Sequence, residues 1–151
     1  MKTSFALSLT LAASLAGVLA PTSTVLAGPT MHHGSVCHNY DIGQANNFDF
    51  YWDGVKNGAT VARWVICPLE VNHTSGQTTG SVYVDAVAPI GGTINCTLTS
   101  YSWTDAFKGS KSGTAPGWLS SVPADSFSNH SVVCSLPPNY NGKIVAIEAY
   151  F

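Results

Sequence analysis

Apolar and polar residues alternate with a period of two along most of the chain, and no segment keeps the 3.6-residue period of an amphipathic helix. The alternation is clear over residues 80–87, and it stops at Pro89 and Gly91-Gly92. This pattern is typical of strands with one buried face. Other segments with strand character are 59–67, 93–103, 131–136 and 143–151, with shorter candidates at 35–40 and 47–53. The sequence therefore predicts an all-β domain, an antiparallel β-sandwich of about seven strands.

Two of these strands carry matching apolar triplets that we expect to face the core. The triplets are Ile94, Cys96, Leu98 and Val132, Cys134, Leu136. The segment 59–67 has apolar residues on both faces, which predicts a central strand. The segment 93–103 is expected to form a hairpin with 80–87, and 47–53 is expected to reach the central strand through a turn at 53–58, where Asp-Gly and Asn-Gly pairs occur. Residues 104–121 are rich in Gly, Ser and Lys and are expected to form one long loop.

The first 27 residues have the organisation of a secretory signal peptide. Lys2 precedes an apolar run over residues 5–20, and Val25-Leu26-Ala27 provides small or aliphatic residues before a cleavage site at Gly28. The run is too short, and too rich in Ser and Thr, to cross a bilayer. We therefore expect residues 28–151 to be one exported domain, secreted or periplasmic, with no transmembrane helix.

The charge of the expected mature chain argues against nucleic acid as a partner. The chain has 6 Lys and Arg against 8 Asp and Glu, and Lys2 is lost with the signal peptide. A phosphate-binding surface needs basic residues gathered in a stripe. The remaining ones are scattered: Lys56, Arg63, Lys108, Lys111 and Lys143.

Four cysteines in an exported chain predict two disulfides, for which three connectivities exist. The matched triplets place Cys96 and Cys134 inward on strands that can be neighbours or face each other. This favours Cys96 with Cys134 and leaves Cys37 with Cys67. A zinc site is disfavoured, because there is no C-x-x-C pair and the cysteines lie far apart in the sequence.

The segments VARWVICPLE, VYVDAVAP, INCTLTSY and VVCSLPPNYNGKIVAIEAYF carry a resemblance. Their early cysteine, V-x-C-P strand, C-x-L strand and late C-x-L-P before a final strand are similar to those of a group of small secreted bacterial proteins without an established activity. The resemblance covers most of residues 28–151. It implies an exported, disulfide-bonded β-sandwich and transfers no catalytic or binding residue.

Motifs for catalysis and cofactors are missing from the sequence. There is no G-x-S-x-G, S-x-x-K or H-E-x-x-H, and no His follows Cys134 as a blue-copper site requires. No cofactor is therefore predicted. The two glutamates, Glu70 and Glu148, leave open a secreted hydrolase whose carboxylates converge from separate strands. The aspartates do not have the spacing of a calcium loop.

Three histidines lie close together near the start of the expected mature chain: His32, His33 and His38, next to Met31. Imidazole and thioether ligands together suit copper. A polar leader segment explains the same residues without a metal, and we predict no metal site there, although the sequence leaves the question open.

Aromatic residues give the one candidate binding surface. If Ile94 and its partners face the core, Tyr101 and Trp103 point outward, where Tyr83 of the adjacent strand and Trp118 of the expected loop can join them. A flat surface of this kind stacks on sugar rings or anchors a protein partner. The alternative is that the loop covers these rings and makes them a second small core.

Two function classes compete at this point. A non-catalytic binding or structural module, possessing no enzyme activity, is favoured by the absent motifs and the aromatic surface. The alternation of Val145, Ile147, Ala149 and Phe151 at the end of the chain is also typical of outer-membrane β-barrels. A barrel of eight or more strands would need nearly the whole chain and many more outward aliphatic residues, so it is disfavoured.

Overall fold

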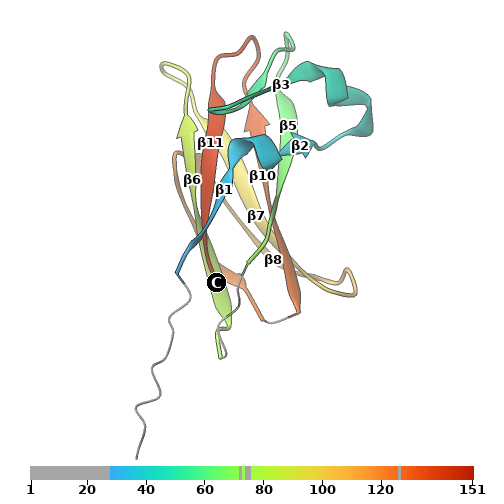
Figure 1. Cartoon of the computed structure of the whole chain (residues 1–151), viewed down its shortest axis with the longest axis vertical. Helices are drawn as coiled ribbons and strands as arrows, with labels where there is room; N and C mark the ends of the chain where they lie inside the picture. Colours follow the sequence, from blue (N-terminus) through green and yellow to red (C-terminus); the bar gives the residue numbers. More distant parts are fainter. Residues whose placement is uncertain (1–27, 72, 74–75, 126) are drawn as a thin grey trace, which may run out of the picture.

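The computed structural model describes residues 28–71, 73, 76–125 and 127–151. The predicted signal peptide lies outside them. The described residues form eleven strands and two short 3-10 helices, η1 (Gly34–Val36) and η2 (Ile42–Asn47). Figure 1 shows the strands running lengthwise in two layers, with the C-terminus at the opposite end from the β3–β4 hairpin. The predicted antiparallel β-sandwich is confirmed.

The first sheet, called sheet A, has six strands. Its order is β3 (Phe48–Tyr51), β4 (Gly54–Asn57), β11 (Lys143–Tyr150), β6 (Thr79–Val87) and β9 (Gly117–Pro123), and β1 (Thr30–His33) also pairs with β11. The second, sheet B, has five strands. Its order is β2 (His38–Asn39), β5 (Arg63–Leu69), β10 (Ser128–Leu136), β7 (Ile94–Ser102) and β8 (Phe107–Ala115).

One core fills the space between the sheets. Both predicted inward triplets, from Ile94 to Leu98 and from Val132 to Leu136, are buried, and so are the alternate residues Val82 and Val84 of β6. Each such aliphatic side chain stabilises the fold by about 1.5–3 kcal/mol through its burial. The alternation in the sequence therefore identifies the inner face of these strands correctly.

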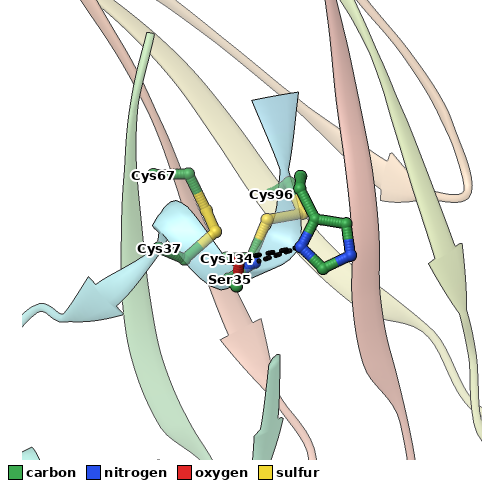
Figure 2. The surroundings of a disulfide bond; sticks show 6 residues. Ser35, Cys37, Cys67, Cys96 and Cys134 are labelled. Carbon is green, nitrogen blue, oxygen red and sulfur yellow. Dashed lines mark hydrogen bonds between the residues drawn. A yellow bond between two sulfur atoms is a disulfide. The ribbon is translucent and has the colours of Figure 1, made fainter. Parts of the chain in front are cut away.

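Both disulfides attach to strands of sheet B. Cys96 on β7 lies directly opposite Cys134 on β10, with their Cα atoms 4.1 Å apart. Cys37, just before β2, is bonded to Cys67 on β5. Figure 2 shows the two bonds close together, as expected for inward residues on adjoining strands. The predicted pairing is confirmed.

The predicted hairpin between residues 80–87 and 93–103 is wrong. β6 pairs with β11 and β9 in sheet A, whereas β7 pairs with β10 and β8 in sheet B. The intervening residues, with Gly91 at a φ of 70°, carry the chain from one sheet to the other. A turn rich in Pro and Gly can connect two strands of one hairpin or carry the chain from one sheet to the other. The sequence alone therefore does not distinguish the two arrangements.

The predicted long loop at residues 104–121 is also wrong, because it contains β8 and most of β9. Of the nine residues of β8 only Ala115 is buried, so the strand has no apolar alternation. The reason is its position: β8 is the last strand of sheet B, and it lies against β9, the last strand of sheet A. A Cβ on Gly109 would lie 2.8 Å from Pro123 Cδ, and one on Gly113 would lie 2.8 Å from Leu119 Cδ2. Glycine lets β9 pack closely against β8.

The remaining predicted strands differ in their boundaries. The segment 35–40 holds η1 and the two-residue β2, and the expected turn at 53–58 contains β4, which completes a hairpin with β3. β5 lies between β2 and β10, but Trp64 on its outer face is 46% exposed, so this strand is not covered on both sides. None of the helices in the described part of the chain has the length and apolar content to cross a membrane.

Candidate functional site

The four aromatic residues singled out in the sequence lie on two different sheets. Tyr83 is on β6 and Trp118 on β9, and both point outward from sheet A. Tyr101, near the end of β7, and Trp103, just after it, belong to sheet B. The expectation of one shared surface is wrong, because it depended on the hairpin between β6 and β7. Two separate aromatic surfaces replace it.

On sheet A, Trp118 stands between two tyrosines. Tyr83 lies directly opposite it on β6, with ring centroids 5.4 Å apart, and Tyr150 on β11 has its ring 5.1 Å away. β9 and β11 are not neighbours, so the Trp118 and Tyr150 side chains meet across β6. Ser81, which is opposite Tyr150, has a side chain small enough to permit this. We call Tyr83, Trp118 and Tyr150 the aromatic cluster.

The aromatic cluster is exposed but it is not flat. Trp118 is 54% exposed, while both tyrosines are half-buried. The indole is inclined at 63° to the Tyr83 ring and at 51° to the Tyr150 ring. Aromatic pairs favour such tilted arrangements over parallel stacking. A ligand would therefore stack on the indole and contact the tyrosines at its edges, rather than rest on the flat surface expected from the sequence.

Polar groups border the aromatic cluster. The Tyr150 hydroxyl donates a hydrogen bond of 2.8 Å to Glu148 Oε2. This bond, together with burial and the carboxylate charge, raises the pKa of Tyr150, so its hydroxyl stays protonated. A carboxylate has more acceptor positions than this one bond uses. Glu148 can therefore also accept hydrogen bonds from a ligand next to the rings.

The second aromatic surface lies at the end of sheet B. Tyr101 packs edge to face on Phe107, with centroids 5.5 Å apart. Trp103 is 71% exposed, and its backbone N–H donates to the carbonyl of Phe127, another exposed ring. We call these four residues the sheet B cluster. Neither Trp103 nor Trp118 is covered by a loop, so the alternative of a second small core is wrong for both.

The histidines near the start of the described chain take separate roles. His32 Nε2 donates to the backbone oxygen of Glu70 at 2.9 Å, and His33 Nδ1 accepts from the N–H of Ser35 and caps η1. His38 is exposed on β2. No three His, Cys, Asp or Glu side chains come together in a way that could hold a metal ion within the described residues.

A cavity of about 370 Å³ lies beside β1. It is lined by Thr30, Met31, His32, Glu70 and Val71. The Thr30 hydroxyl donates to the Glu70 backbone oxygen, as His32 does, so two side chains of β1 attach this strand to the end of β5. Sequence reasoning did not find this cavity, because its walls come from two sheets and depend on the path of β1.

Comparison with known proteins gives no match to a family model, a curated protein or a solved structure. The function of the chain is therefore inferred from the side chains of its own surface, among which the aromatic cluster combines exposed rings with fixed polar groups.

Proposed function

We propose that this protein is a non-catalytic binding module that recognises a neutral carbohydrate through the aromatic cluster. The observation that carries the proposal is the position of Trp118, more than half exposed and yet held between the rings of Tyr83 and Tyr150. An indole kept in a fixed orientation at the surface offers apolar area to a ligand with little loss of side-chain freedom.

Carbohydrate suits this surface better than a purely apolar ligand. The C–H face of a sugar ring stacks on an aromatic face, while its hydroxyls need hydrogen-bond partners around the ring. Glu148 and the tyrosine hydroxyls are such partners, and the Tyr150 hydroxyl already fixes the Glu148 carboxylate. The excess of acidic over basic residues in the chain opposes an anionic ligand.

Export belongs to the same proposal. The predicted signal peptide over residues 1–27 and the resemblance to small secreted bacterial proteins support a secreted or periplasmic location. The two disulfides agree with it, because such bonds form and persist in oxidising compartments. Extracellular and periplasmic proteins meet polysaccharides, which is consistent with the proposed ligand.

A protein partner at the sheet B cluster is the second candidate function. Its four aromatic side chains are exposed: the rings of Tyr101 and Phe107 are in contact, and the backbones of Trp103 and Phe127 are hydrogen-bonded. Aromatic residues carry much of the energy of protein interfaces. The ion pair between Lys108 and Asp125 adds a charged group to β8 and the turn before β10. Asp125 is the carboxylate beside these rings, but it already accepts hydrogen bonds from the Phe127 N–H and the Ser128 hydroxyl and pairs with Lys108, so it is less available to a ligand than Glu148.

A glycan array probed with the oxidised protein tests the proposal. Trp118→Ala removes the central ring, and Trp103→Ala is a matched control that removes an exposed indole from the other surface. We expect wild type and Trp103→Ala to bind the same neutral glycans and Trp118→Ala to bind none. Absence of binding by the wild type, or equal binding by Trp118→Ala, would contradict the proposal.

A further inference from the structure

We propose that the ligand is a linear neutral oligosaccharide that lies across the strands of sheet A and extends from Trp118 to the cavity beside β1. This inference rests on the proposed function and specifies its ligand. It follows from the alignment of four outward residues with a cavity at one end of their row.

The four residues are in register on adjacent strands. Met31 on β1 is opposite Glu148 on β11, Glu148 is opposite Tyr83 on β6, and Tyr83 is opposite Trp118 on β9. Neighbouring strands are about 4.8 Å apart, so the row spans roughly 14 Å. A pyranose unit in a linear chain advances by a similar distance to the strand spacing. The row therefore matches an oligosaccharide of three to four units.

The row ends beside the cavity, because Met31 belongs to both. Thr30 and His32 alternate with Met31 and face the other way, opposite buried residues, so the ligand would turn over the edge of β1 to enter the cavity. The other cavity residues include Thr30 and His32, whose side chains both bond the Glu70 backbone oxygen. These bonds fix one wall before any ligand arrives, which reduces the entropy lost on binding. A cavity of about 370 Å³ with a largely polar lining has room for a terminal sugar.

Charge restricts the kind of sugar. Glu148 lies within the row and Glu70 beside the cavity, and no Lys or Arg occurs among the residues of either. The two carboxylates accept hydrogen bonds from hydroxyls and repel acidic groups. Uronic acids and sulfated sugars are therefore excluded in favour of neutral units.

A ladder of oligosaccharides, from one unit to six of the repeat identified on the array, tests the inference by calorimetry. We expect the affinity to rise up to three or four units and then to level off. Glu70→Gln and Met31→Ala should each weaken binding of the longer ligands roughly fivefold while binding of the disaccharide is unchanged. Asp105→Asn and Ile42→Ala are matched controls at exposed positions elsewhere, and they should bind like wild type.

The outcomes separate this inference from the proposed function. If Trp118→Ala abolishes binding but the affinity does not depend on length beyond the disaccharide, and the cavity variants bind like wild type, the extended path is wrong and the binding module stands. Tighter binding of an acidic than of a neutral oligosaccharide also refutes it. If the wild type binds no member of the ladder, both proposals fail.

Discussion

The imidazole of His130 packs against the ring of Phe151 in the core, with ring centroids 4.1 Å apart. His130 is 4% exposed, and its Nε2 lies 3.3 Å from Ser100 Oγ and 3.4 Å from the Pro123 oxygen. Its Nδ1 is buried and has no hydrogen-bond partner among the residues that the structure describes. Protonation would place an unpaired N–H and a charge in the core. Burial accordingly lowers the pKa of His130 to about 4.

This histidine makes the fold sensitive to acid. Electrostatic interactions with His73 and Lys108 also lower the pKa of His130, while the bond to Pro123 and the charge of Asp125 raise it. Unfolded His130 binds a proton near pH 6.5, and the folded residue binds one only near pH 4. Stability is therefore complete above about pH 6.5 and falls as the pH drops to about 4, by up to about 3 kcal/mol. Chemical denaturation at a series of pH values measures this loss.

The matched variant for this prediction is His130→Leu. It replaces the titrating imidazole with an apolar side chain of similar size. It should flatten the pH dependence between pH 6.5 and 4, even if its stability at pH 7 is lower than that of wild type. His38→Ala, at an exposed position, should leave the wild-type slope intact. An unchanged slope in His130→Leu would show that another group is responsible.

The ring of Phe151 packs directly against the backbone of Gly80. A Cβ added at Gly80 would lie 2.0 Å from Phe151 Cε1. Gly80→Ala should therefore displace the ring and destabilise the fold by about 1–3 kcal/mol, as overpacking does. Gly43→Ala is the control, because its nearest atom would be 3.9 Å away. Equal free energies of unfolding for both variants would contradict the packing described here.

The exposed tryptophans should contribute little to stability, in contrast to Phe151. Trp103→Ala should change the free energy of unfolding by no more than about 0.5 kcal/mol, because an exposed ring has few packing contacts. Phe151→Ala removes a buried ring and should cost about 3–5 kcal/mol. Thermal melts of the two variants compare them directly. A large loss of stability in Trp103→Ala would mean that this ring is part of the core.

The two disulfides should differ in their effect on stability. They close loops of similar length, 30 and 38 residues apart in sequence, so each contributes about 4 kcal/mol in the chain-entropy model. Cys96 and Cys134 join two strands inside sheet B, whereas Cys37 precedes an edge strand of two residues. Replacing the first pair with alanine should therefore cost more than replacing Cys37 and Cys67. Chemical denaturation of both double variants measures the two losses of unfolding free energy. A greater loss for the Cys37 and Cys67 variant would refute the prediction.

The fold class, the inward triplets and the cysteine pairing could be predicted from the sequence, because each depends on alternation within a strand. Cys96 and Cys134 occupy the same place in matching C-x-L segments, and the structure puts them opposite each other. The sheet to which a strand belongs depends instead on long-range packing. Residues 88–93 have the Pro and Gly of an ordinary turn, and they gave no sign that the chain crosses between sheets.

The candidate site was only partly predictable for the same reason. Tyr83 was expected on an outer face, and Trp118 in a loop above it rather than on a strand. Their partner Tyr150 was not singled out, because β11 becomes a neighbour of β6 only in the folded sheet. β8 was missed because glycine and polar residues replace the apolar alternation where β9 packs against it. The glycines of β8 are explained by the contact with β9, and the local sequence does not reveal that contact.

The most direct test of carbohydrate binding at the aromatic cluster is to follow the four indole N–H signals of the 15N-labelled protein by NMR during titration with the neutral oligosaccharide found on the array. Variants with Phe at each of Trp52, Trp64, Trp103 and Trp118 assign the signals. We expect the Trp118 signal to shift in proportion to saturation and the other three to stay in place. A Trp118 signal that does not move at saturating ligand, or a shift confined to Trp103, would contradict the account.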